Sequence, residues 1–580
     1  MSHHECKDET NHSSHKGMKV QQKRNPYWPK GIPHNITVPQ VTLPHCLLTS
    51  AQRFPNKTAI VFCENTFTYA ELQTHVDSMA AYLQKALGVR PGDRVLLFSQ
   101  NCPQFVIAYY AALSIGAVIV PVNAMCTTEE VRYFMENSDA EYAFVARELV
   151  DAVLPCMQTE KSKGLKHIVV HIYKDMLTKL DSHDIPAFIK QDYAPIERPD
   201  VHDFQTILIE KRYQAGALET SPHDFCVLPY TSGTTGKAKG CIHTHFTMLS
   251  SIYGSTMWRN MHSESVILAV APMFHLLGMQ NSMNIPIFLG STVIMMPRWD
   301  AGLAVKLCAR HRVSSWTAPP AMVLDFFSHP SAREADLSSL SLLTGGGAAM
   351  AESVALMLKE RFGIVYNEGY GMTETASFLH CNPLNHPRRQ CLGIETQGVD
   401  SRIVDPVTLK ELPRGEIGEL VTSGSQIMLG YWKNPEANEE SFFDMDGKRF
   451  FRTGDLARID EDGYFFMTDR LKRMINVSGY KVWPSEVENT MFAHPAIQEV
   501  CIVGIHDEKQ GEQVRALVVL KDGIVAGEKE IIAWSREHMA VYKAPRSVAF
   551  FDELPKSNTG KIMWRKLQNE QNAEAITLKK

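Results

Sequence analysis

The residues best suited to chemistry lie in one short segment, residues 230–240, which reads Tyr-Thr-Ser-Gly-Thr-Thr-Gly-Lys-Ala-Lys-Gly. Its glycines let backbone N–H groups converge, its hydroxyls donate hydrogen bonds, and its lysines supply the positive charge that a desolvated phosphate requires. An apolar run at 225–228 precedes it and a helical pattern follows from His243, which favours a loop between a strand and a helix over a flexible linker. The segment predicts a phosphate-binding loop. It is not a Walker loop, because Gly-x-x-x-x-Gly-Lys-Ser/Thr cannot be read in any register.

Five further stretches follow in a fixed order: 345–347 (Gly-Gly-Gly), 368–374 (Glu-Gly-Tyr-Gly-Met-Thr-Glu), 451–455 (Phe-Arg-Thr-Gly-Asp), 469–472 (Asp-Arg-Leu-Lys) and 557–561 (Ser-Asn-Thr-Gly-Lys). With the phosphate loop they resemble the adenylate-forming superfamily of acyl-CoA and aryl-CoA synthetases, luciferases and peptide-synthetase adenylation domains. The resemblance covers about residues 40 to 570 and is strongest to the fatty acyl-CoA synthetases.

The resemblance implies a two-step reaction in which ATP and Mg²⁺ activate a carboxylic acid as an acyl-adenylate and coenzyme A then takes up the acyl group. Tyr370 would stack on adenine, Asp455 and Arg470 would bind the ribose, and Glu374 would hold the metal. The implied catalytic residues are Lys561, Thr373, Glu374 and His275. The implied ATP-binding residues are Thr231, Ser232, Gly233, Thr234, Thr235, Gly236, Lys237, Lys239, Gly347, Glu368, Gly369, Tyr370, Gly371, Met372, Thr373, Asp455, Arg470 and Lys561.

For coenzyme A, the expected residues are Ser478, Gly479, Tyr480, Ala544, Pro545 and Arg546. Lys543 and Arg546 are placed to meet its phosphates, and a solvated charged surface is the alternative interpretation of these two residues. Lys472 matches the family's hinge. The expected fold is α/β: a disordered leader over residues 1–30, a large multi-layer adenylation domain over 31–470, and a small mobile α/β domain over 471–580. Strand-like runs at 142–145, 167–170, 265–270 and 292–295 alternate with helical patterns and predict largely parallel sheets.

Composition narrows the class of protein. The chain has 580 residues, of which 44% are hydrophobic, and a net charge of -5 without a basic stripe, so we expect no nucleic-acid partner. Twelve cysteines without a paired framework fit a reducing, cytoplasmic setting. Residues 105–122 could suggest a membrane span, but Ser114, Gly116 and Pro121 divide them into a buried helix and a core strand. We expect no transmembrane segment; peripheral membrane contact and a homodimer are compatible with the sequence.

The identity of the carboxylic acid substrate is inferred from one segment of the sequence. Apolar residues around 279–289, with no evident fixed basic residue to meet a second carboxylate, favour a monocarboxylic fatty acid of medium to long chain. Two alternatives stay open: the same chemistry serving an aryl acid or another acceptor, and a catalytically silent nucleotide-binding protein. Ala238, Glu368 and Glu395 depart from the residues usual in the family, and none of these changes removes a charged catalytic group. Cys241, His243 and His245 are interpreted as ordinary packing residues, not a metal cluster.

Overall fold

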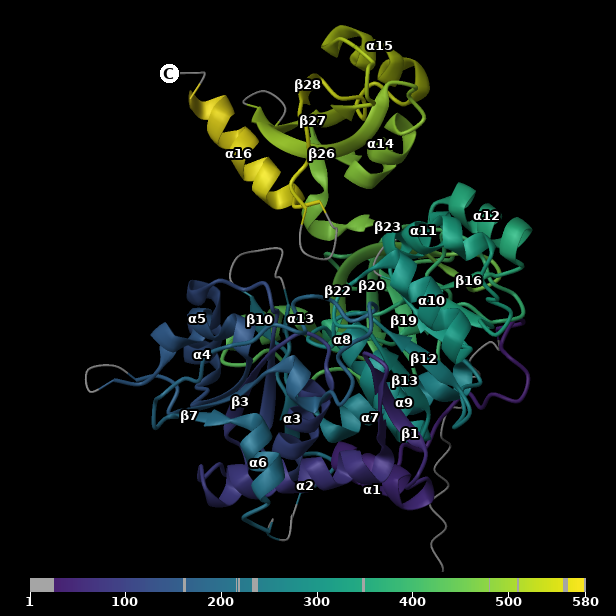
Figure 1. The fold of residues 1–580 in the computed structure, drawn as a ribbon. Helices are drawn as coiled ribbons and strands as arrows, with labels where there is room; N and C mark the ends of the chain where they lie inside the picture. The colour runs from purple at the N-terminus through teal and green to yellow at the C-terminus, as the bar shows by residue number, and fades with distance from the viewer. Residues whose placement is uncertain are drawn as a thin grey trace, which may run out of the picture.

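The computed structural model describes residues 25–159, 163–214, 216, 220–231, 238–346, 350–478, 480–507, 511–556 and 562–577. Two sheets form the centre of the large N-terminal part, and a separate sheet with its helices forms the C-terminal part above it in Figure 1. The α/β class expected from the sequence is confirmed. Within the described ranges, no helix combines the length and apolar character needed to cross a bilayer.

The first sheet has nine strands in the order β18-β17-β16-β15-β14-β12-β13-β1-β2. Six neighbouring strands, β16 to β1 in that order, run parallel, and the strands at both edges are antiparallel. Its strands are β1 (Thr58–Phe62), β2 (Asn65–Thr68), β12 (Val266–Ala269), β13 (Thr292–Met295), β14 (Ser315–Thr317), β15 (Leu342–Gly345), β16 (Tyr366–Tyr370), β17 (His380–Cys381) and β18 (Ile394–Glu395).

The second sheet has seven strands in the order β11-β8-β4-β3-β5-β6-β7, and only β11 runs antiparallel to its neighbour. Its strands are β3 (Arg94–Phe98), β4 (Val118–Val122), β5 (Tyr142–Ala146), β6 (His167–His171), β7 (Val201–Asp203), β8 (Phe225–Val227) and β11 (His243–Thr244). All four predicted strand-like runs are confirmed. The predicted division of residues 105–122 is confirmed as well, by α3 (Pro103–Ser114) and β4.

Helices cover both faces of each sheet, as parallel strands require. One core joins inward residues of both sheets to α1 (Leu43–Arg53), α2 (Tyr69–Lys85), α3, α6 (Phe204–Glu210), α7 (His245–Trp258) and α9 (Ile285–Leu289). The outer face of the nine-stranded sheet carries α10 (Ala301–His311), α11 (Pro320–Ser328) and α12 (Glu352–Phe362), and the outer face of the other carries α4 (Thr128–Ser138) and α5 (Val150–Val153). In β3, Val95 and Leu97 face the shared core while Leu96 and Phe98 face outward, the alternation of a strand buried on both sides.

A third, antiparallel sheet lies between the paired sheets and the C-terminal part (Figure 1). It contains β19 (Asp400–Val404), β20 (Gly418–Ser423), β21 (Phe442–Met445), β22 (Lys448–Ile459) and β23 (Phe465–Arg470), with α13 (Pro435–Ser441) before β21. The C-terminal sheet contains β24 (Ile475–Val477), β25 (Tyr480–Val482), β26 (Ile497–Asp507), β27 (Gly511–Leu520) and β28 (Ser547–Phe550), with α14 (Pro484–Met491), α15 (Glu528–His538) and α16 (Trp564–Thr577). Strands β26 and β27 form one long antiparallel hairpin.

The predicted leader is too long at its C-terminal end. Residues 1–24 lie outside the described residues, but Asn25 donates from its side chain to the carbonyl of Asp462 at 3.1 Å. Tyr27 and Trp28 pack in a cluster with Trp258 and Tyr464. These contacts stabilise residues 25–30 against the large domain, so they are not part of a disordered segment.

Glu395 in β18 predicts a pH dependence of stability. Loss of hydration on burial, helped by the nearby Asp400, raises the pKa of this carboxyl from 4.5 to about 7. The folded protein therefore takes up a proton that the unfolded chain has released, and stability falls as the pH rises from about 4.5 to 7. Glu395→Gln keeps an acceptor for the N–H of Ser401 but has no charge. We expect it to stabilise the protein at pH 8 by up to about 3 kcal/mol and to have no effect at pH 4; thermal unfolding at both pH values measures this, and an equal gain at both would contradict it.

Candidate active site

The predicted site segments follow the carboxyl ends of parallel strands, where ligands bind in α/β sheets. The phosphate loop follows β8, the segment with His275 follows β12, the Gly345 segment ends β15, and Tyr370 ends β16. The chain enters and leaves the phosphate loop through a small antiparallel pair, β9 (Tyr230–Thr231) and β10 (Lys239–Gly240). Residues 232–237, which carry Ser232, Gly233, Thr234, Thr235, Gly236 and Lys237, lie outside the described residues, as do Gly347, Gly479 and Lys561.

Glu374 lies at the centre of the described site. It belongs to a short 3₁₀ helix, Thr373–Thr375, directly after β16, and is buried. The hydroxyl of Tyr431 donates to its Oε1 at 2.8 Å, and the N–H of Met428 donates to its backbone carbonyl at 2.8 Å. Burial raises the pKa of Glu374. A buried carboxylate with free lone pairs suits a cation, which would restore the charge balance that burial disturbs.

Positively charged side chains lie on this side of the domain, and the charge of Arg470 acts on the Glu374 carboxyl, lowering its pKa against the larger effect of burial. The Nζ of Lys239 lies 4.9 Å from the centre of the Tyr431 ring. Burial, together with the charges of Lys239 and Arg565, lowers the pKa of Lys472. Lys239, which follows the predicted phosphate loop, is the member of this group placed to meet a polyphosphate.

Tyr370 and Asp455 are brought together as the sequence predicts for one nucleotide site. The Tyr370 hydroxyl donates to Oδ2 of Asp455 at 2.6 Å, and Nε of Arg470 lies 3.1 Å from the other carboxylate oxygen. Asp455 is 2% exposed. Gly371 next to Tyr370 has no room for a side chain, because a Cβ there would lie 1.9 Å from the carbonyl oxygen of Ser377.

Other predicted residues take different positions. Glu368 is buried, and its carboxylate accepts from the N–H of Met350 at 2.8 Å, so it holds the backbone near the 345–347 segment. Gly369 pairs with Cys381 across β16 and β17, and Met372 precedes the 3₁₀ helix of Thr373. His275 lies at the N-terminus of α8 (Leu276–Gly278), and its ring centre is 4.8 Å from that of Phe274.

The residues expected at coenzyme A divide into exposed and buried ones. Tyr480 is 60% exposed, and its ring centre lies 5.0 Å from that of Tyr542. Ser478, just before it, has a positive φ of 53°. Ala544 and Pro545 are buried, whereas Arg546 is exposed. Among the described residues of this group, Ser478, Tyr480 and Arg546 are exposed to solvent.

The chain was compared with known proteins. Residues 47–432 match the AMP-binding enzyme family, and residues 486–561 match the AMP-binding enzyme C-terminal domain. The chain belongs to the AMP-binding enzymes. It is an AMP-forming CoA ligase that uses ATP, Mg²⁺ and coenzyme A.

The relatives of the ligase are named after different acids. A long-chain-fatty-acid–CoA ligase of Bacillus subtilis is 33% identical over 557 residues, covering 94% of this chain and 97% of the relative. A feruloyl-CoA synthase of Amycolatopsis is 32% identical, covering 88% and 96%. The structure of a Mycobacterium tuberculosis fatty acyl CoA synthetase superposes with a TM-score of 0.69 at 27% identity, covering 92% of this chain and 99% of that one.

Three residues near the ligase's site have no signal in a sequence motif. Tyr431 bonds Glu374, as described above. The Nε2 of His243 lies 2.8 Å from the carbonyl oxygen of Thr373. Burial lowers the pKa of the His243 ring to about 4, so the ring is neutral and donates its Nε2 hydrogen to this carbonyl. The interpretation of His243 as a packing residue therefore omitted that it positions the site. Arg259 is a buried basic residue beside the 279–289 segment, where it bonds Asn281.

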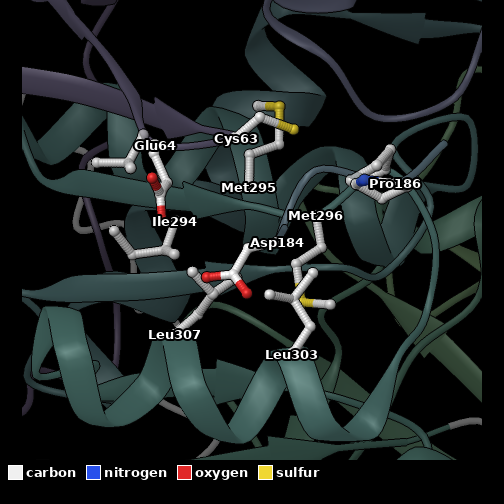
Figure 2. Close-up of a pocket in the computed structure, with 11 residues that line it drawn as sticks. Cys63, Glu64, Asp184, Pro186, Ile294, Met295, Met296, Leu303 and Leu307 are labelled. Atoms are coloured by element: carbon white, nitrogen blue, oxygen red, sulfur yellow. The ribbon is translucent and has the colours of Figure 1, made fainter. Parts of the chain in front are cut away.

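A separate pocket of the ligase is unrelated to these residues. Figure 2 shows it between the ends of β1 and β13 and helix α10, lined by residues such as Cys63, Glu64, Asp184, Met296 and Leu303. Its cavity volume is about 20 Å³, which is near the minimum for one water molecule and too small for an acyl chain. It contains none of the predicted site residues.

Proposed function

We propose that this ligase activates an aliphatic fatty acid of medium to long chain. The adenylation chemistry rests on the buried carboxylate of Glu374, which is bonded by Tyr431 and lies near the Asp455–Arg470 pair. The choice of acid rests on the segment after His275. The segment that follows His275, residues 279–289, mixes polar and apolar residues, and its apolar members Met279, Met283, Ile285 and Ile287 pack in the central core. An apolar wall of this kind suits an aliphatic chain.

In the first step, a carboxylate attacks the α-phosphorus of ATP and pyrophosphate leaves. Lys239 and the phosphate loop would bind the β- and γ-phosphates, and Asp455 with Arg470 would fix the ribose. Glu374 would supply one ligand to Mg²⁺, which neutralises phosphate charge when bound. Magnesium commonly takes only one or two protein carboxylates and completes its shell with phosphates and water. A single protein carboxylate, Glu374, is compatible with such a site. The described part of the chain holds no group of three or more His, Cys, Asp or Glu residues placed to hold a metal ion.

In the second step, the coenzyme A thiol attacks the acyl-adenylate and AMP leaves. We propose that the domain boundary lies at residues 470–471 and that the C-terminal domain rotates there between the two steps. The rotation would withdraw Lys561 and bring the Ser478–Tyr480 segment to the acyl group. Thr373 would bind the α-phosphate, and the hydrogen bond from His243 to its backbone carbonyl would fix its position. His275 would line the path to the carboxylate.

The test is a pyrophosphate-release assay across a panel of acids, with and without coenzyme A. We expect release with aliphatic acids of medium to long chain and thioester formation once coenzyme A is added. Aryl acids are included because a feruloyl-CoA synthase is a close relative. Activity only with aromatic or amino acids would refute the fatty-acid proposal, and no pyrophosphate release with any acid would favour a silent nucleotide-binding protein.

Tyr431→Phe is expected to raise the Mg²⁺ concentration for half-maximal adenylate formation about 10-fold. The change removes only the hydroxyl that donates to Glu374 at 2.8 Å, so the carboxylate would lose its orientation but keep its charge. Initial rates over a Mg²⁺ titration measure the effect. Tyr464→Phe is the matched control, since its hydroxyl donates to the carbonyl of His386. The same shift in both variants would contradict a role for Tyr431 at the metal.

A further inference from the structure

Arg259 carries a buried positive charge without a matching negative one. It follows α7 directly and is 9% exposed. Its Nη1 donates to Oδ1 of Asn281 at 2.5 Å, and its guanidinium lies 5.1 Å from the centre of the Phe378 ring. Its Nε has no hydrogen-bond partner, and among the described residues no Asp or Glu lies within ion-pair distance of it. A buried cation of this kind is expensive unless something pairs with it.

Other unsatisfied polar atoms lie at the same end of α7. Ser255, one helical turn before Arg259, is 1% exposed, and its hydroxyl has no partner. Gln397 is 3% exposed, and neither atom of its side-chain amide is paired. Gly254 lies between these groups: a Cβ there would be 3.7 Å from Oε1 of Gln397 and 3.8 Å from the Phe378 ring. Buried polar groups are normally hydrogen-bonded, so several unpaired ones together indicate a missing partner, and their N–H and O–H groups call for an acceptor.

The elements that hold Arg259 are the same ones that hold the reacting site. The Ser251 hydroxyl of α7 donates to the carbonyl of Ala376, two residues after Glu374, at 2.6 Å. Gln280 donates to the carbonyl of Met248 in α7 at 3.0 Å, and the next residue, Asn281, is the partner of Arg259. At a helical rise of 1.5 Å per residue, Arg259 lies about 12 Å along α7 from Ser251. The guanidinium therefore lies at the end of α7 away from the Ser251–Ala376 contact, beside Asn281 of the segment assigned to the acyl chain.

We propose that Arg259, with Ser255 and Gln397, binds a second carboxylate at the end of the acid distant from the reacting carboxyl. The substrates would then be α,ω-dicarboxylic fatty acids. This inference rests on the proposed function, because it assumes an aliphatic acid along α7. A guanidinium presents several N–H donors in one plane and pairs especially well with a carboxylate. With a second carboxylate bound by Arg259, the substrate is charged at both ends, unlike the monocarboxylic acid expected from the sequence.

The wild-type ligase alone tests the inference. Pyrophosphate release is measured with paired mono- and dicarboxylic acids of equal length, from 6 to 16 carbons. At the best length we expect the diacid to have a kcat/KM at least about 10-fold above that of the monoacid, as a charge-assisted hydrogen bond provides. If monoacids are better at every length, the inference is wrong and the proposed function stands. If no aliphatic acid is activated, both are wrong.

Variants then test which residue determines the preference for a dicarboxylic over a monocarboxylic acid. Arg259→Met keeps the length of the side chain but not its charge, and we expect the diacid-to-monoacid ratio of kcat/KM to fall by roughly 10- to 100-fold. Arg389→Met is the control, because Arg389 is exposed and pairs with Glu352 at 3.0 Å. If Arg259→Met does not fold, Gln397→Leu and Ser255→Ala should lower the same ratio. An unchanged ratio with equal losses for both acids would show that Arg259 is only structural and would overturn the proposal.

Discussion

Lys561→Ala is expected to lower the rate of acyl-adenylate formation by on the order of 100- to 1,000-fold, while supplied acyl-adenylate is still converted to the thioester at nearly the wild-type rate. Its charge is needed while negative charge gathers between the carboxylate and the α-phosphorus. Pantetheine later approaches the same face, so Lys561 cannot remain there in the second step. A residue that acts in one transition state affects one half-reaction.

Single-turnover measurements of each half-reaction check this expectation. Lys561 itself lies outside the described residues, but the next residue, Ile562, bridges to Lys556 in the C-terminal domain. Lys556→Ala is the matched control: this lysine is near in sequence, pairs with Glu499 at 2.5 Å, and should leave both half-reactions unchanged. Equal losses of both half-reactions in Lys561→Ala would remove Lys561 from the adenylation step.

Lys472→Pro is expected to give the complementary result, near-normal adenylate formation with a thioester step slowed on the order of 100-fold. Lys472 lies in a short 3₁₀ helix, Leu471–Arg473, between β23 and β24. On one side Arg470 is paired with Asp455 across β22 and β23, and on the other Ile475 is paired with Val482. Only residues 471–474 remain outside the two sheets, so a rotation of the C-terminal domain would concentrate in their torsions.

Proline at this position would fix its own φ near roughly -65° and disfavour the helical conformation of Leu471. The domain would then stay in one arrangement although no substrate contact is removed. Lys472→Ala serves as the control, because it removes the charge that lies near Lys239 but leaves the backbone free. We expect both half-reactions to stay near normal in that variant. A folded Lys472→Pro protein with an unchanged thioester step would show that this residue is not the pivot.

The sequence by itself determined the features that depend on local residue types. Glycines, hydroxyls and lysines at 230–240 predict a phosphate loop, because these groups act through neighbouring backbone atoms. Runs of apolar residues at 142–145 and 292–295 became β5 and β13, since a strand buried on both faces needs nothing more than consecutive apolar side chains. The division of residues 105–122 likewise followed from Gly116, whose φ of 75° lies in the left-handed region that other residues avoid.

Only the tertiary structure decided which distant side chains meet. Tyr431 reaches Glu374 across 57 residues of sequence, and His243 reaches Thr373 across 130. Arg259 and Asn281 are 22 residues apart and meet because α7 packs against the segment after β12. Such contacts are set by the order of strands in the sheets and by the helices between them, so no local pattern marks them. The specificity of the ligase depends on this level, because an acyl chain is surrounded by side chains from several separate elements.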